Sequence, residues 1–159
     1  MPLTEQDAAA GFAALARRYC RWAQATPGEP RAEILLAREL LAALQYTQLL
    51  LPEATVGGEH EMVAVPQSHW DEVRRRFEVL PIDEYWEVYD PFSDESPVVV
   101  SVPDCLADID RDLRQGLYLF DAGAVREAAW QWRILHGVHW GRQLLGVQRA
   151  IHAWLARHE

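Results

Sequence analysis

The chain contains no lysine, and all 15 of its basic residues are arginines. A Schiff base, an anchored pyridoxal phosphate, a phosphate-loop lysine and a lysine general base all require the missing side chain. These chemistries are therefore excluded for this chain before any motif is considered.

Cysteines and long apolar runs are also scarce. Cys20 and Cys105 are far apart and lack the spacing of a zinc site or a redox motif. Because both fall within segments of helical pattern, we expect them to be reduced and buried. No apolar run approaches the roughly 20 residues that span a bilayer, and we recognise no signal peptide. We therefore expect a cytoplasmic protein.

Positive charge is in deficit, because 15 basic residues stand against 24 acidic ones and give a formal net charge of -9. Nucleic acids and anionic membranes attract proteins of the opposite sign. Arginines do cluster at residues 17–21 and 74–76, but acidic or apolar residues share their helices, so we interpret both clusters as solvated faces. We expect neither nucleic acid nor a membrane as a partner.

The residues that are present fit one globular domain. Apolar residues make up 50% of the chain and charged residues 25%, as in ordinary folded proteins. A chain of 159 residues has the usual size of one domain and buries roughly 70% of its unfolded surface. We expect a single helical domain over residues 1–159.

Apolar residues repeat with helical period in five segments. The first segment begins after Thr4, where Asp7 completes an approximate capping box. The second, over residues 31–51, is so apolar that we place it at the centre of the bundle. The third begins at Ser68, with Asp71 as a similar capping partner.

The last two segments are the longest. Ser101 and Pro103 mark the start of the fourth helix, since serine caps helices and proline favours their first turn. The fifth segment, over residues 125–157, is too long for its neighbours at about 1.5 Å per residue. We expect a kink near Gly137 or Gly141. These patterns predict an all-α fold, a compact bundle of about five helices.

A long loop is expected before the fourth helix, over residues 81–100, which contain three prolines and no helical period. Residues 98–100 suit an extended conformation, but without a second strand we expect no sheet. The loop is rich in aromatic residues: Tyr85, Trp86, Tyr89 and Phe92. Ordering a loop costs about 1 to 2 kcal/mol per residue, so we expect it to lie over the helices with Trp86 as its main anchor. The alternative is a mobile loop that offers its aromatic residues to a partner.

One constellation suits a metal. Three aspartates recur every four residues along one flank of the fourth helix: Asp104, Asp108 and Asp112. His136 and His139, three residues apart on the last helical segment, can approach one point. Two aspartates and two histidines on facing helices suit a divalent cation. A metal-dependent enzyme with this site between the last two helical segments is therefore our alternative hypothesis.

A structural role for the same residues is the simpler interpretation. The Glu-x-x-His pairs of di-iron bundles are missing, and neither cysteine has the signature of a nucleophile. We expect Asp108 or Asp112 to pair with Arg133 or Arg142, and His136 to be a core histidine with one satisfied nitrogen. We therefore assign no metal and no cofactor, and favour a protein without enzymatic activity.

Several short motifs resemble a bacterial family of domains of unknown function, family five-zero-six-three. They are Tyr85 to Pro91 with Pro97, Leu106-Ala107-Asp108-Ile109 with Asp112-Leu113, Trp130 or Trp132, Trp140-Gly141, and Ala150-Ile151-His152. The resemblance implies a compact helical fold of this size and carries over no activity or catalytic residue. Cys105 stands where the family pattern has an acid, and Asp110 where an aromatic residue is common, which further weakens the metal hypothesis.

We predict a small protein-interaction or regulatory module whose acidic surface and aromatic loop bind another protein. The candidate binding residues are Asp108, Asp112, His136, His139, Trp140, Arg142, Tyr85 and Trp86. An interaction module predicts an exposed apolar patch around the loop. The enzyme predicts a polar pocket where the two aspartates and two histidines converge.

Overall fold

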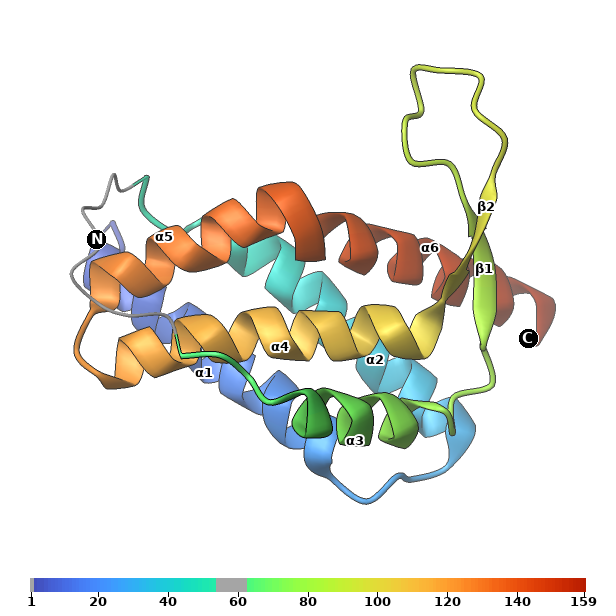
Figure 1. Cartoon of the computed structure of the whole chain (residues 1–159), viewed down its shortest axis with the longest axis horizontal. Coiled ribbons are helices and arrows are strands. Elements are labelled where there is room, and N and C mark those ends of the chain that lie inside the picture. Colours follow the sequence, from blue (N-terminus) through green and yellow to red (C-terminus); the bar gives the residue numbers. More distant parts are fainter. Residues whose placement is uncertain (1, 54–62) are drawn as a thin grey trace.

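The computed structural model describes residues 2–53 and 63–159 (Figure 1). In chain order its elements are α1 (Glu5–Gln24), α2 (Pro30–Gln48), α3 (Gln67–Phe77), β1 (Glu84–Glu87), β2 (Val98–Ser101), α4 (Val102–Asp121), α5 (Val125–Leu135), the π-helix η1 (His136–Trp140) and α6 (Gly141–Arg157). Because α5, η1 and α6 follow one another directly, they form the one long helical segment that the sequence predicts. The predicted helical bundle is confirmed, with a small two-stranded sheet added to it.

Helix α4 occupies the centre of the bundle and contacts α1, α3, α5 and α6. Figure 1 shows it running through the middle of the molecule. Its apolar stripe is buried: Val102, Leu106, Ile109, Leu113 and Leu117. Since neighbouring helices surround α4, its polar side chains also lie against other helices.

Helix α2 lies at the edge of the bundle, mainly against α1 and α6, so its predicted central position was wrong. Ile34 and Leu40 face the core, whereas Leu35 is exposed. Ala32 and Ala42 are also exposed on this helix, and such small side chains leave little apolar area in water. A high apolar content therefore did not require a neighbour on every face.

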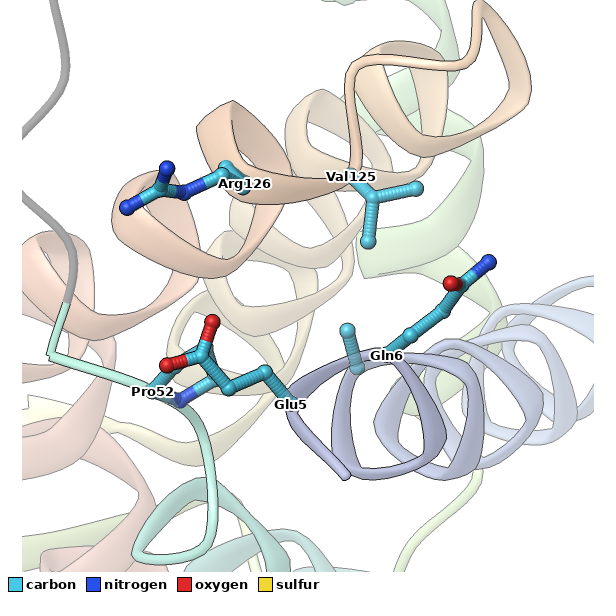
Figure 2. Close-up of a pocket in the computed structure, with 6 residues that line it drawn as sticks. Glu5, Gln6, Pro52, Val125 and Arg126 are labelled. Atoms are coloured by element: carbon cyan, nitrogen blue, oxygen red, sulfur yellow. The ribbon is translucent and has the colours of Figure 1, made fainter.

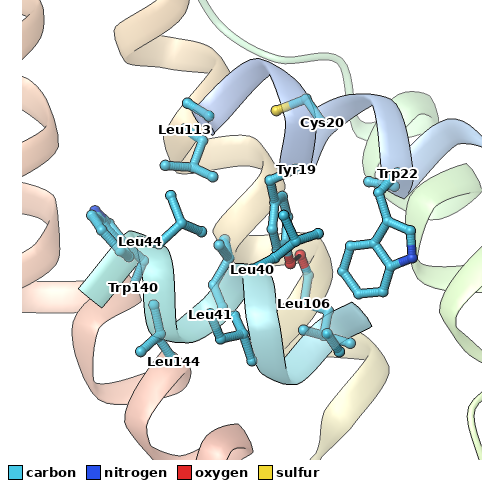
Figure 3. Packing of buried hydrophobic residues seen from close by; sticks show 14 of the residues in the cluster. Tyr19, Cys20, Trp22, Leu40, Leu41, Leu44, Leu106, Leu113, Trp140 and Leu144 are labelled. Atoms are coloured by element: carbon cyan, nitrogen blue, oxygen red, sulfur yellow. Dashed lines mark hydrogen bonds between the residues drawn. The ribbon is translucent and has the colours of Figure 1, made fainter. Parts of the chain in front are cut away.

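Aromatic rings pack at the centre of the core. The ring of Phe12 lies 4.8 Å from that of Trp132 and 6.1 Å from that of Trp140. The indole N–H of Trp132 donates to the Leu113 carbonyl at 3.1 Å, and that of Trp140 donates to the Trp132 carbonyl at 3.0 Å. Figure 3 shows Trp140 beside Leu44 of α2. Because the polar atoms of these rings are satisfied, both tryptophans can be fully buried.

The helix starts were predicted with mixed success. Thr4 and Asp7 form a complete capping box, and the Ser101 hydroxyl accepts a hydrogen bond from the Asp104 amide. Helix α3 starts one residue earlier than predicted, after Pro66, so Ser68 is inside the first turn and caps nothing. The ring of Pro66 fixes an extended entry into the helix without a side-chain cap.

The predicted kink in the last helical segment is a turn of π-helix, η1. It ends at Trp140 and is followed by Gly141, where an added Cβ would overlap the carbonyl oxygen of His136. A glycine is therefore required for this tight passage, and π turns of this kind often mark functional positions. No helix in the described ranges is both long enough and apolar enough to cross a membrane.

Both cysteines are buried and unpaired, as predicted. Burial raises the pKa of Cys20 well above its usual value and that of Cys105 to about 12. Because the thiolate is the reactive form of cysteine, neither side chain is prepared to act as a nucleophile.

Residues 84–101 form a β-hairpin, so the prediction of a loop without a sheet was wrong. Strands β1 and β2 are antiparallel, with Tyr85 opposite Val100 and Trp86 opposite Val99. The Val102 amide donates to the Asp83 carbonyl at 2.9 Å, which ties the base of the hairpin to the start of α4. Figure 1 shows the hairpin projecting beyond the helices. The short β1, with glutamates at both ends, lacks the apolar run that usually signals a strand.

Candidate functional site

Helix α4 carries the predicted aspartates into contacts with α3, α6 and η1. Asp104 accepts a hydrogen bond from Arg74 of α3 at 2.6 Å. One turn later Asp108 lies between α3 and α6, and Asp112 lies opposite η1. The spacing of four residues therefore places all three carboxylates on one flank, as predicted.

His139 of η1 lies between two of these carboxylates. Its Nδ1 is 2.5 Å from Oδ2 of Asp112, and its Nε2 is 3.7 Å from Oδ2 of Asp108. The hydrogen bond to Asp112 raises the pKa of His139, although burial opposes the shift. Burial also raises the pKa of Asp112, against the influence of His139. Both shifts favour the protonated forms of His139 and Asp112. A protonated imidazole is better suited to an ion pair than to the role of a general base.

Asp108 is held by three donors from two other elements and its own helix. The indole N–H of Trp70 and the guanidinium of Arg111 donate to Oδ1 at 2.8 and 2.7 Å, and the Gln143 amide donates to Oδ2 at 2.7 Å. This network joins α3, α4 and α6. The predicted partners were wrong: Arg133 donates to the Leu51 carbonyl instead.

His136 does not join this network. Its Nε2 lies 2.9 Å from the side-chain oxygen of Gln45 on α2, and its ring meets Trp140 edge-on at 4.7 Å. The wider π turn separates His136 from His139, which a regular helix would bring to one side. The predicted convergence of two aspartates and two histidines is therefore absent. One nitrogen of His136 is satisfied, as predicted, but the side chain is half-buried and does not lie in the core.

No group of three or more His, Cys, Asp or Glu side chains within residues 2–53 and 63–159 is arranged to hold a metal ion. The carboxylates of Asp108 and Asp112 already face hydrogen-bond donors. The network can therefore fix the packing of three helices, and it presents no open coordination position among these residues.

A second buried carboxylate, Asp110, was not predicted from the sequence to be buried or to have partners. It is fully buried, and its Oδ2 lies 2.9 Å from both Nε2 of His69 and Nε of Arg114. Arg114 also donates to the Cys20 carbonyl, so the cluster joins α1, α3 and α4. The spacing of four residues between Asp110 and Arg114 was a visible signal. The contact with His69 was not, since it depends on how α3 packs.

The hairpin is anchored by its inward side chains. Tyr85 packs against the core, and its hydroxyl lies 3.9 Å from the Cys105 sulfur. An added Cβ on Gly146 of α6 would overlap the Tyr85 hydroxyl and the Glu87 carboxylate. The guanidinium of Arg142 lies over the Tyr89 ring, 4.4 Å from its centre. Tyr85, and not Trp86 as predicted, is therefore the main anchor of this segment.

The outward side of the hairpin is apolar and exposed. Trp86 is 69% exposed, its cross-strand neighbour Val99 is 49% exposed, and Phe92 in the connecting loop is 97% exposed. Six acidic residues and no basic residue accompany them between positions 82 and 101: Asp83, Glu84, Glu87, Asp90, Asp94 and Glu95. The hairpin therefore exposes several large apolar side chains to solvent.

A groove of about 340 Å³ lies beside the base of the hairpin, between β1 and the last turns of α6. Its lining includes the rings of Trp86 and Trp154 and the side chains of Arg149 and Arg157. The ring of His158 stacks on Trp154 at 4.1 Å, with an angle of 14° between the planes. Sequence patterns could not reveal this groove, because its two walls are more than 60 residues apart.

A smaller pocket of about 260 Å³ lies at the opposite end of the bundle (Figure 2). It lies between the starts of α1 and α5, where Ala9, Pro52 and Val125 provide apolar walls and Glu5 and Arg126 lie at the rim. None of the residues predicted to bind a ligand lines it. We therefore place the candidate functional site at the hairpin and its groove.

Comparison with known proteins agrees with this architecture. The crystal structure of protein BF1032 from Bacteroides fragilis is similar over 90% of this chain and 89% of that one, with a TM-score of 0.77 and 18% sequence identity. At that identity the likeness shows the fold alone. No curated protein matches the sequence. Residues 4–157 match the family described as Domain of unknown function (DUF5063), and the chain therefore belongs to that family.

Proposed function

We propose that this chain is a protein-interaction module and that its β-hairpin contacts the partner. The observation that carries the proposal is the exposure of Trp86, Val99 and Phe92 on a hairpin that projects from the bundle. Isolated apolar side chains are common on protein surfaces. A row of them on one projecting element is typical of an interface, where aromatic residues supply much of the binding energy.

The charge of the hairpin indicates the chemistry of the partner. Exposed acidic residues, among them Asp90, Asp94 and Glu95, flank the exposed rings along the chain, so a favourable partner surface combines arginine or lysine side chains with an apolar pocket. The anchoring of Tyr85 and Tyr89 supports the same role, since a hairpin held at its base loses less conformational entropy on binding.

Site-specific photo-crosslinking in cells tests this function. A photoreactive phenylalanine analogue at position 92 should trap a discrete protein adduct, whereas the same analogue at Tyr46, which is exposed on α2, should not. Changing Asp94 and Glu95 to their amides should lower the adduct yield, because the expected partner is basic. Equal labelling from positions 92 and 46, or no adduct from position 92, would contradict the proposal.

The geometry gives no support to a metal-dependent enzyme at this site, because His136 and His139 face different partners. The acidic network at α4 explains the same residues as links between helices.

A further inference from the structure

The groove beside β1 has the chemistry that the hairpin requires of a partner. The rings of Trp86 and Trp154 provide apolar walls, and Arg149 and Arg157 provide positive charge. Within the part of the chain that the structure describes, neither arginine makes a salt bridge. Glu84 is the only carboxylate among the described residues that line the groove. In a chain of net charge -9, this is a locally basic site suited to one apolar side chain flanked by acids.

The tip of the hairpin carries such a side chain in an ordered turn. The Phe92 amide donates to the Asp90 carboxylate at 2.9 Å, and the Ser93 amide donates to the Asp90 carbonyl at 3.2 Å. This arrangement, in which an aspartate bonds the backbone two residues on, fixes the turn before any partner is present. Phe92 is 97% exposed, and Asp94 and Glu95 follow it after Ser93.

We propose that the hairpin tip of one copy of this chain docks into the groove of a second copy, with Phe92 between Trp86 and Trp154 and with Asp94 and Glu95 near Arg149 and Arg157. The inference rests on the proposed function and identifies its partner. The Phe92 ring and the two carboxylates of the tip are complementary to the two tryptophan rings and the two arginine guanidinium groups of the groove. A volume of about 340 Å³ admits one phenylalanine side chain.

A two-fold arrangement of two copies fills both grooves at once. Trp86 at the groove and Phe92 at the tip are six residues apart, so an extended hairpin separates them by at most about 20 Å. Two hairpins side by side in opposite directions then place each tip at the other groove. Such an interface is self-complementary and closes at two copies. Within one copy the tip projects away from the end of α6, which together with β1 lines the groove (Figure 1).

Sedimentation velocity of the full chain over a wide concentration range tests this dimer. The unmodified protein should form a dimer that weakens as salt is added, because the paired charges are at the surface. Phe92→Ser should weaken dimerisation about 30-fold or more, as expected for a central aromatic contact. Because Phe92 is almost fully exposed, this change leaves the fold intact, which circular dichroism verifies.

A charge swap tests the specific pairing. The double change Arg149→Glu with Arg157→Glu should abolish the dimer, and so should Asp94→Arg with Glu95→Arg. An equimolar mixture of these two variants should form a heterodimer that neither forms alone, through one native and one charge-reversed pair of tip and groove. The matched control, Arg31→Glu with Arg38→Glu on α2, should dimerise like the unmodified protein.

Three results would overturn the dimer: an unmodified protein that is monomeric throughout, a dimer that survives both charge reversals, or a mixture that does not associate. An adduct with a different protein at position 92, together with a monomeric chain, would reject the dimer and leave the proposed function standing. The absence of any adduct at position 92 would reject the proposed function itself.

Discussion

The α4 network and the hairpin use similar residues in opposite ways. In the network, Trp70, Asp108 and His139 face partners from neighbouring helices. On the hairpin, Trp86 and Phe92 face solvent, and the carboxylates around them outnumber any local positive charge. The comparison teaches that aromatic and acidic residues stabilise this fold where neighbouring helices contact them, whereas on the hairpin they stay in solvent, where we propose that a partner binds.

The largest expected effect separates a core tryptophan from a hairpin tryptophan. Trp132→Ala should lower the free energy of unfolding by about 3 to 5 kcal/mol, because the fully buried ring leaves a cavity and the Leu113 carbonyl loses the indole N–H as a donor. Trp86→Ala should change it by no more than about 0.5 kcal/mol, since that ring is largely in water. Urea unfolding measures both values, and similar losses would remove the distinction between the two regions.

The next effect concerns the acidic network. Asp108→Ala should cost about 1 to 3 kcal/mol of unfolding free energy, because Trp70, Arg111 and Gln143 lose their shared acceptor. Asp94→Ala is the matched control, since Asp94 lies on the exposed hairpin. If Asp108→Ala were as harmless as the control, the network would not be what joins α3, α4 and α6.

A change at Gly146 tests how the hairpin is anchored. Gly146→Ala should displace β1, because the added methyl group overlaps the Tyr85 hydroxyl and the Glu87 carboxylate. The expected cost is about 1 to 3 kcal/mol, together with faster proteolysis between Pro81 and Pro97. Gly11→Ala in α1, where an added Cβ meets nothing, is the control. An unchanged cleavage rate would show that the hairpin is held elsewhere.

The smallest effect is a dependence of stability on pH. The pKa of His139 is raised in the folded chain, so its ion pair stabilises the fold fully below the unfolded value of about 6.5. This contribution disappears as the pH rises through the folded pKa. Thermal unfolding of the unmodified chain should therefore show a loss of stability above about pH 6.5 that His139→Gln removes. An identical pH profile for the variant would contradict the assignment.

His136 should show the opposite slope. Burial lowers the pKa of this histidine, so stability is lost as the pH falls from about 6.5 through the folded pKa. His136→Gln should reduce that loss on the acid side and leave the alkaline side unchanged.

Helices were predictable because their signals are local. The capping box at Thr4, the cap at Ser101 and the kink before Gly141 each depend on residues within a few positions of one another. The hairpin was missed because β1 has only four residues, and its partner strand follows ten residues later. Pairing between strands depends on residues that local periodicity does not connect.

The candidate site was predictable only in part. Sequence spacing placed Asp108, Asp112 and His139 near one another, but it also included His136, which the π turn directs to Gln45. The buried pair of His69 and Asp110 was missed because it joins residues more than 40 positions apart. Trp86 was predicted to be an anchor from its size alone. Size does not show which face of a strand a ring occupies.

The central claim is that the exposed side chains of the hairpin serve binding and not folding. One variant tests both parts of this claim. Phe92→Ser should leave the free energy of unfolding within about 0.5 kcal/mol of the unmodified chain while it abolishes the adduct formed by a photoreactive residue at Val99, on the same exposed hairpin. A variant that unfolds more easily but still forms that adduct would contradict the account.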